Sequence, residues 1–536
     1  MASRSVGQAY KRFDGAQSYD AIIVGSGIGG LACALLLAKY GQKKILVLER
    51  HYTAGGFTHT FKRPGYEWDV GVHYIGDVGD KRSATRRMFD ELAGGRLEWA
   101  PMPDAYDRII LGDSAFDLVA GRDALRERLE SYFPGESSAI GRHFELVREV
   151  TRSASGFFAE KAVPAPMAWL AGGLMRRRFM RLASRTTRDV LEELTGDQQL
   201  IAVLTGQFGD YGLPPSESSF AIHAMVHHHY LKGGFYPIGG AGEIAVHIGH
   251  EIEQRGGSIL INAEVKRILV EGTRATGVEM IDGRVLRAPI VVSDAGVANT
   301  CDRLLGEVGR PLDTLRRHVR SIGPAAAHLC LYLGCRASDD ELGTQATNLW
   351  IYPDEKHDEN IARFLRDPDA PLPLVYVSFP SRKDPSFQER YPGRATIEVL
   401  TLGSYDWFKA WEDRPWHRRS EAYEALKQRF SDRLLDALYQ HVPQLKGRID
   451  HCELSTPLST RTFTNYEKGE IYGLKHTPQR FRTRSLKPRT PIRGLYLTGQ
   501  DVCTCGVTGA LFGGTLTASA VLGRNLMSRI ASSSRR

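Results

Sequence analysis

The fold is decided by residues 20–50, which read DAIIVGSGIGGLACALLLAKYGQKKILVLER. The apolar run Asp20–Val24 predicts a short buried strand, and a glycine-rich turn leads from it into a helix over Leu31–Tyr40. A second buried strand is predicted over Ile45–Leu48. This βαβ unit indicates an α/β fold with a Rossmann-like domain.

The glycine turn and the acid after the second strand predict a dinucleotide site. Gly25 allows the sharp turn out of the strand, Gly27 lets the backbone approach a pyrophosphate, and Gly30 lets the helix pack on the strand. The helix N-terminus offers free N–H groups to the phosphates. Glu49 ends the second strand, where its carboxylate can accept both hydroxyls of an adenosine ribose.

The next residues favour FAD over NAD as the cofactor. Arg50 follows the acid, and the pair Gly55-Gly56 comes six residues after Glu49. Such a second glycine pair resembles the two-dinucleotide-binding-domain flavoproteins, in which it contacts the same pyrophosphate. The segment that ends at Val265 is similar to the one whose backbone holds the adenine in these flavoproteins.

The C-terminal region contains a second glycine-rich segment that is predicted to contact the cofactor. A strand over Leu495–Thr498 delivers Asp501 to a loop, where its carboxylate can bind ribityl hydroxyls. A helix predicted over Gly506–Met527 begins there, and its N-terminus at Gly506 and Val507 can stabilise negative charge on a reduced flavin ring. Cys503 and Cys505 are one residue apart, which fits neither a C-x-x-C redox motif nor a zinc site, so a catalytic thiol is disfavoured.

The candidate catalytic residues lie near the predicted ring position. A strand running through residues 66–74 would place Asp69, Gly71 and His73 on one face, with the glycine permitting close approach to a flat ring. We expect His73, Tyr74 and Tyr236 to contact the reacting groups, with His73 donating a proton or orienting the substrate. The alternative, a purely structural histidine, is equally compatible with the residue type.

A histidine cluster does not predict a metal site. His223 and His227 are spaced i and i+4, with His228 and His229 beside them. No metalloprotease glutamate and no further Cys/His pair accompanies them, so a polar pocket wall or an exposed helix face is the better interpretation, and we expect no metal.

The composition is that of a globular protein, with 42% hydrophobic and 25% charged residues and a formal charge of +8. No nucleic-acid-binding signature is present, so a nucleic-acid partner is not expected. The seven cysteines form an odd and sparse set, which indicates a reducing compartment. The sequence has no secretory signal and no spanning run of apolar residues, so we expect a cytoplasmic protein.

One segment suggests peripheral contact with a membrane surface. Residues 160–185 mix apolar bulk with basic side chains, namely Arg176, Arg177, Arg178 and Arg181. Such a segment can dip into an anionic membrane while its arginines hold headgroups. A core helix with a solvated basic edge explains the pattern equally well.

These motifs resemble the phytoene-dehydrogenase-related flavoproteins, which include carotenoid desaturases, carotenoid isomerases and retinol saturases. Within that family the chain is most similar to retinol saturases, at His59-Thr60-Phe61, His73-Tyr74 and the run from Gly499 to Gly506. The resemblance implies an amine-oxidase-like FAD domain interleaved with a mixed α+β substrate domain. It assigns residues 1–80, 234–300 and 470–536 to the former, and residues 81–233 and 301–469 to the latter.

The resemblance also implies a function. It predicts an FAD-dependent oxidoreductase that saturates or desaturates carbon–carbon double bonds of a long hydrophobic polyene, a retinoid, a carotenoid or an unsaturated lipid. The alternative is a redox-neutral polyene cis–trans isomerase. A flavin amine oxidase and an FAD-containing lipid-binding protein are less favoured. The expected electron partner is a quinone, oxygen or a separate reductase.

Overall fold

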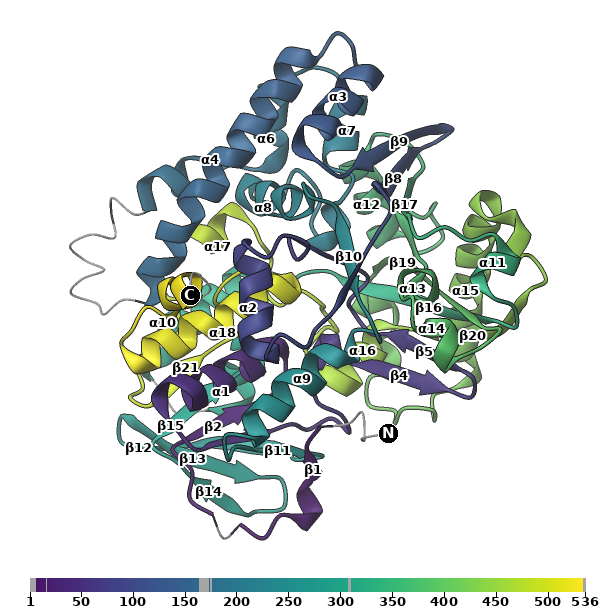
Figure 1. The fold of residues 1–536 in the computed structure, drawn as a ribbon. Helices are drawn as coiled ribbons and strands as arrows, with labels where there is room; N and C mark the ends of the chain where they lie inside the picture. Colours follow the sequence, from purple (N-terminus) through teal and green to yellow (C-terminus); the bar gives the residue numbers. More distant parts are fainter. Residues whose placement is uncertain (1–5, 16, 163–172, 174–175, 307–309, 534–536) are drawn as a thin grey trace.

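The computed structural model describes residues 6–15, 17–162, 173, 176–306 and 310–533, and its strands form two main sheets (Figure 1). The first sheet has six parallel strands in the order β1 (Gln8–Ala9), β11 (Ser258–Ile261), β3 (Ile45–Leu48), β2 (Ala21–Val24), β15 (Ile290–Ser293) and β21 (Leu495–Leu497). Segments far apart in the sequence therefore pair within one Rossmann-like sheet.

Both faces of this sheet are covered. Ala21 and Ile23 pack among the helices α1 (Ile28–Gly41), α9 (Gly242–Glu253) and α18 (Gly506–Leu522). Ile22 and Val24 point the other way, onto the three-stranded sheet of β12 (Val265–Glu271), β13 (Arg274–Met280) and β14 (Val285–Arg287). A strand buried on both faces is apolar throughout, which is the pattern of residues 21–24.

The second sheet is mixed and has seven strands. Their order is β20 (Ile449–Ser455), β16 (Ala327–Cys335), β19 (Ala395–Gly403), β18 (Val375–Ser378), β17 (Asn348–Tyr352), β8 (Ala105–Leu111) and β9 (Ser114–Val119). Helix α15 (Glu421–His441) shares one hydrophobic core with it. A layer of helices shares another core with β8 and β17, at the top of Figure 1: α3 (Arg122–Tyr132), α4 (Ser137–Ala162), α6 (Thr187–Glu192), α7 (Gln198–Leu204) and α8 (Phe220–Tyr230).

Short strands link the two halves. The hairpin of β4 (Thr60–Arg63) and β5 (Tyr66–Asp69) lies against β16, where Trp68 Nε1 donates a hydrogen bond of 2.9 Å to the Leu333 carbonyl. A small sheet then pairs β10 (Gly234–Pro237) with β6 (Ile75–Gly76) and β7 (Trp99–Pro101). The chain between β5 and β6 therefore crosses from one half to the other.

Two predicted elements are wrong in part. The strand expected through residues 71–73 ends at Asp69, because its partner β4 begins at Thr60, directly opposite. The C-terminal helix expected to reach Met527 ends at Leu522, because Gly523 adopts a left-handed conformation with φ of 64°. A separate helix, α19 (Leu526–Ser533), follows.

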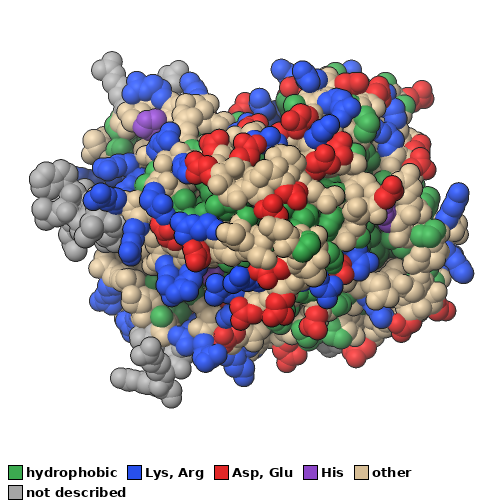
Figure 2. All heavy atoms as spheres, turned by 90° about the horizontal axis from the view of Figure 1, so that it is seen from above, with side chains coloured by type: hydrophobic (Ala, Val, Ile, Leu, Met, Phe, Trp, Pro, Cys, Tyr) green, Lys and Arg blue, Asp and Glu red, His purple; other side chains and the backbone are tan. Residues whose placement is uncertain are grey.

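The candidate membrane segment falls partly outside the described residues, since residues 163–172 and 174–175 are not described. Of its arginines, Arg176 is buried and paired with Glu160 at 3.1 Å, whereas Arg177 and Arg178 are exposed. Within the described part of the chain, no helix is both long enough and apolar enough to cross a bilayer. On the face drawn in Figure 2, acidic and basic side chains are interspersed, with basic ones denser toward the left.

Helices α1 and α18 approach each other so closely that glycine is required at the crossing. A Cβ atom at Gly514 would lie 2.4 Å from the Gly29 carbonyl oxygen and 2.8 Å from Ala32 Cβ. Both contacts are far shorter than van der Waals separation, so a larger residue must push the helices apart.

We therefore expect Gly514→Ala to destabilise the protein by about 1–3 kcal/mol, as overpacking a core does. The matched control is Gly141→Ala in α4, where a Cβ would meet its nearest atom at 3.5 Å. That substitution should be neutral or stabilising, because alanine favours a helix interior. Thermal unfolding of the two variants checks this, and equal melting temperatures would contradict the packing argument.

Candidate active site

One large cavity of about 400 Å³ runs between the two halves of the molecule. The glycine turn and the end of β3 line one part of it, and side chains of the second sheet line another. Among the residues predicted to hold a cofactor, those in the cavity wall are Gly25, Gly27, Glu49, Arg50, Gly55, Gly56, Val265, Asp501, Gly506 and Val507. Gly30 lies behind the wall, where a Cβ would approach the Gly25 carbonyl oxygen to 2.5 Å.

Glu49 organises the turn as well as facing the cavity. Its Oε2 accepts hydrogen bonds from the backbone N–H of Ser26 at 2.9 Å and from the Ser26 hydroxyl at 2.7 Å. Its Oε1 accepts from the backbone N–H of His51 at 2.7 Å. The carboxylate is thus held at the strand end, where the lone pairs left over can accept ribose hydroxyls.

Asp294, which follows β15, is a site residue that sequence reasoning missed. Its carboxylate accepts hydrogen bonds from the backbone N–H groups of Gly27 and Gly30. A Cβ at Gly27 would lie 2.5 Å from Asp294 Oδ2, so glycine is needed there for the carboxylate as well as for a phosphate. Burial raises the pKa of Asp294 to about 8, which favours a neutral acid next to the turn.

The C-terminal loop is fixed by Asp501. Its Oδ2 accepts from the Val297 N–H at 2.9 Å and its Oδ1 accepts from the Leu474 N–H at 2.9 Å. Cys503 and Cys505 are buried free thiols, and burial raises the pKa of both. Neither thiol is a ready nucleophile, since only the thiolate attacks.

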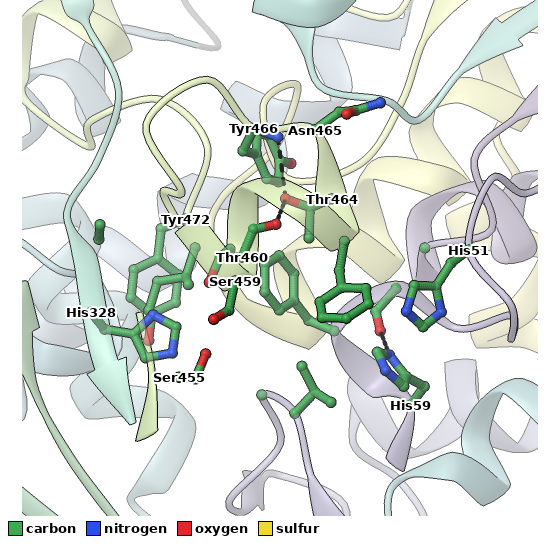
Figure 3. Close-up of a pocket in the computed structure, with 18 of the residues that line it drawn as sticks. His51, His59, His328, Ser455, Ser459, Thr460, Thr464, Asn465, Tyr466 and Tyr472 are labelled. Carbon is green, nitrogen blue, oxygen red and sulfur yellow. Dashed lines mark hydrogen bonds between the residues drawn. The ribbon is translucent and has the colours of Figure 1, made fainter. Parts of the chain in front are cut away.

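The other end of the cavity is lined by aromatic and aliphatic side chains. They include Tyr332, Trp350, Leu374, Tyr376, Leu400, Leu402 and Tyr472. Figure 3 labels several residues that line the cavity, among them His328, Ser455, Ser459 and Tyr472. His328 lines the cavity and is 8% exposed, and its Nδ1 is a buried atom with no hydrogen-bond partner in the protein.

His73 lies in the cavity wall, where its ring centroid is 5.2 Å from that of Tyr376. Its Nδ1 is 2.8 Å from Glu398 Oε2, without the alignment of a hydrogen bond. Burial, followed by the charge of Lys383, lowers the pKa of His73 to about 3. The imidazole is therefore neutral near pH 7, which suits it to orienting a substrate rather than to acting as an acid.

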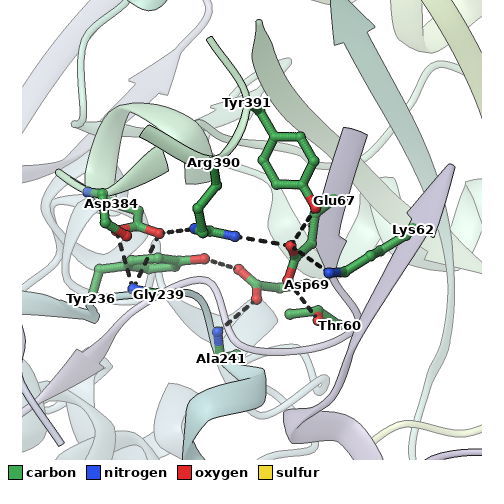
Figure 4. Close-up of polar contacts among 11 residues, drawn as sticks. Thr60, Lys62, Glu67, Asp69, Tyr236, Gly239, Ala241, Asp384, Arg390 and Tyr391 are labelled. Atoms are coloured by element: carbon green, nitrogen blue, oxygen red, sulfur yellow. Dashed lines mark hydrogen bonds and ion pairs between the residues drawn. The ribbon is translucent and has the colours of Figure 1, made fainter. Parts of the chain in front are cut away.

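Tyr74 and Tyr236 lie outside the cavity wall. The Tyr74 hydroxyl is hydrogen-bonded within a buried cluster that contains Asp107. The Tyr236 hydroxyl donates to Asp69, which also accepts from the Ala241 N–H at 3.0 Å (Figure 4). Tyr236 thus holds the loop that opens α9.

Figure 4 also shows how residues 384–391 are tied to the β4–β5 hairpin. Arg390 contacts Glu67 at 2.9 Å and also pairs with Asp384. The Gly239 N–H donates to the Asp384 carboxylate at 3.2 Å. These contacts hold residues 384–391 against the β4–β5 hairpin and against the loop at Gly239.

The histidine cluster is a buried packing unit. His223 and His227 lie beside His143 of α4, with ring centroids 5.4 Å and 4.8 Å from it. No group of three His, Cys, Asp or Glu side chains among the described residues has the geometry to hold a metal ion.

Glu398 makes stability depend on pH. Burial raises the pKa of this fully buried carboxyl group to about 8, above its unfolded value of about 4.3. Between those two values the folded state binds the extra proton, so the stability that Glu398 contributes is lost as the pH rises.

We therefore expect the melting temperature of Glu398→Gln minus that of wild type to increase as the pH rises from 5 to about 8, because only the wild type loses stability over this range. The control is Glu279→Gln, because hydrogen bonds from Lys266 and Arg267 lower the pKa of Glu279, so its effect should be constant over that range. Differential scanning fluorimetry across the range measures both. A pH-independent difference for Glu398→Gln would contradict the proposed burial of a neutral acid.

Comparison with known proteins agrees with the fold. The family described as "NAD(P)-binding Rossmann-like domain" matches residues 23–92. A solved structure of putrescine oxidase superposes with a TM-score of 0.62 at 16% identity, covering 95% of this chain and 100% of that one. The amine-oxidase-like architecture predicted from the sequence is confirmed.

Curated relatives match almost the whole chain. The all-trans-retinol 13,14-reductase of Danio rerio is 39% identical, over 95% of this chain and 87% of its own length. The inactive all-trans-retinol 13,14-reductase of the same species is 32% identical, over 95% and 86%. The prolycopene isomerase of Arabidopsis thaliana is 26% identical, over 96% and 84%.

The resemblance to retinol saturases drawn from the motifs is thus confirmed, and the isomerases are more distant relatives. This chain belongs to the all-trans-retinol 13,14-reductase family of oxidoreductases.

Proposed function

We propose that this protein is an FAD-dependent oxidoreductase that reduces a carbon–carbon double bond of a retinoid, with all-trans-retinol as the first candidate substrate. The observation that carries the proposal is one continuous cavity, which is lined both by the glycine turn and by the aromatic side chains of the second sheet. A dinucleotide and a long apolar molecule can therefore meet inside it. The relative from Danio rerio adds the name of the candidate substrate.

The residues of the crevice fit FAD. Gly27 and Gly56 leave room for a pyrophosphate, and a Cβ at Gly56 would lie only 2.9 Å from Gly27 Cα. Glu49 would hold the adenosine ribose, Val265 the adenine, and the N-terminus of α18 the ring system. When bound and reduced, FAD supplies a hydride.

The chain itself contributes orientation and exclusion of water. Trp350, Tyr376 and Leu402 offer the apolar surface that a polyene needs, and the His73 ring lies 5.2 Å from that of Tyr376, measured between centroids. We propose that His73 orients the double bond and that the His328 side chain, which lines the same cavity, contacts a polar end group. Holding the reacting atoms in line is worth several orders of magnitude in rate.

The test is a single turnover without air. The flavin of the purified protein is reduced chemically, so that no partner protein is needed, and all-trans-retinol is added. We expect the flavin to be reoxidised and a product two mass units heavier, because one hydride and one proton are added. A product of unchanged mass would identify an isomerase, and no product from any retinoid would contradict the proposal.

We expect His73→Ala to lower the single-turnover rate at least about 100-fold while the flavin stays bound, because a misplaced substrate loses its alignment. His441→Ala, at the end of α15 and outside the cavity wall, is the control and should keep the wild-type rate. Flavin absorbance and reoxidation rate are the measurements. A normal rate in His73→Ala would exclude the orienting role.

A further inference from the structure

Asp210 lies at the junction of the two ends of the cavity. It closes the short helix η3 (Phe208–Asp210), and it lines the cavity wall together with Gly209. Its carbonyl oxygen is 3.8 Å from Cys505 Sγ, directly before the N-terminus of α18. A Cβ at Gly209 would lie 2.5 Å from the Trp350 ring. Asp210 therefore lies between the crevice proposed for the cofactor ring and the aromatic chamber.

A tyrosine joins this acid to a second one. Tyr74 Oη is 2.8 Å from Asp107 Oδ2 and 3.2 Å from Asp210 Oδ2. Asp107 is fully buried and also accepts from Gln207 Nε2 at 2.7 Å and from Asn348 Nδ2 at 2.8 Å.

The hydrogen-bond donors around Asp107 and Asp210 indicate which of the two acids carries a proton. Asp107 has the donors that stabilise a carboxylate, including the single proton of the Tyr74 hydroxyl at the shorter distance. A Tyr74 lone pair then faces Asp210, which satisfies it best when Asp210 carries a proton of its own. Burial raises the pKa of Asp107 as well, but its three hydrogen-bond donors oppose that shift, so the arrangement favours Asp107 as the ionised partner and Asp210 as the protonated one.

Charge and burial act in the same direction. Burial, followed by the charge of Asp107, raises the pKa of Asp210 to about 8. Lys383 opposes this shift from the side of Asn348. The other titratable groups that interact with Asp210 are Tyr74, Tyr106, Tyr211, Tyr230, Tyr352, Tyr376, Tyr472 and Cys505.

We propose that Asp210 is the catalytic acid that protonates the double bond, with Tyr74 and Asp107 as positioning residues. The inference rests on the proposed function and adds to it the source of the proton. The Asp210 O–H bond breaks and a C–H bond forms at one alkene carbon, while the other carbon receives a hydride from the reduced dinucleotide. The Asp210 carboxylate takes a proton from solvent when product leaves.

Asp210 provides the proton donor that His73 cannot be. A histidine that is neutral near pH 7 holds its remaining ring proton too tightly to protonate an alkene, whereas a neutral carboxyl group in the cavity wall is a competent acid. The two side chains then have separate tasks.

The test compares Asp210→Asn with wild type in the anaerobic single turnover with all-trans-retinol. Asparagine keeps the shape of the side chain but has no acidic proton. We expect the rate at pH 7 to fall at least about 100-fold, the lower range for general acid catalysis, with retinol binding and melting temperature retained. The wild-type rate should fall above about pH 8, and that alkaline limb should be absent from Asp210→Asn.

A second variant tests whether the charge of Asp107 sets the pKa of Asp210. Asp107→Asn removes the negative charge that raises the pKa of Asp210 and does not alter the cavity wall, so the alkaline limb should move to lower pH by about one unit. A rate for Asp210→Asn within tenfold of wild type, or a persisting alkaline limb, would overturn the inference alone. Failure of the wild type to reduce any retinoid would instead overturn the proposed function, and the inference with it.

Discussion

The carboxyl group of Asp294 is the contact on which the rest of this structure depends. It occupies the space that Cβ atoms would fill at Gly27, Gly29 and Gly499, at 2.5, 2.8 and 2.5 Å. Three segments that are distant in the sequence therefore meet around one side chain. Its bonds to the N–H groups of Gly27 and Gly30 hold the turn that a dinucleotide must approach. The glycines thus serve the internal assembly of the crevice as much as the ligand.

The two main sheets contribute different parts of the cavity wall. The parallel sheet supplies backbone N–H groups and one acid at a strand end, which suit a charged dinucleotide. The mixed sheet supplies aromatic walls, which suit a molecule with few polar atoms. The cavity between them is where buried acids become useful, because low dielectric raises the pKa of a carboxyl group and keeps a proton available near pH 7.

Much of the fold and of the cofactor crevice could be predicted from the sequence, for a local reason. Residues 20–50 carry their own pattern of strand, glycine turn, helix and strand-end acid. The predicted cofactor residues, apart from Gly30, then lie in one cavity wall. The expected strand through residues 71–73 was wrong because strand pairing depends on where the partner begins, and that partner, β4, begins at Thr60.

The reacting end of the site could not be predicted in the same way. Asp210, Asp294 and His328 follow no motif of fixed spacing, and their surroundings come from elements hundreds of residues away, as Tyr74 and Cys505 do for Asp210. The sequence by itself determined the dinucleotide-binding unit and the family, because both reside in short local patterns. Only the tertiary structure decided which carboxyl groups are buried and which face the cavity, because burial is a property of the assembled chain.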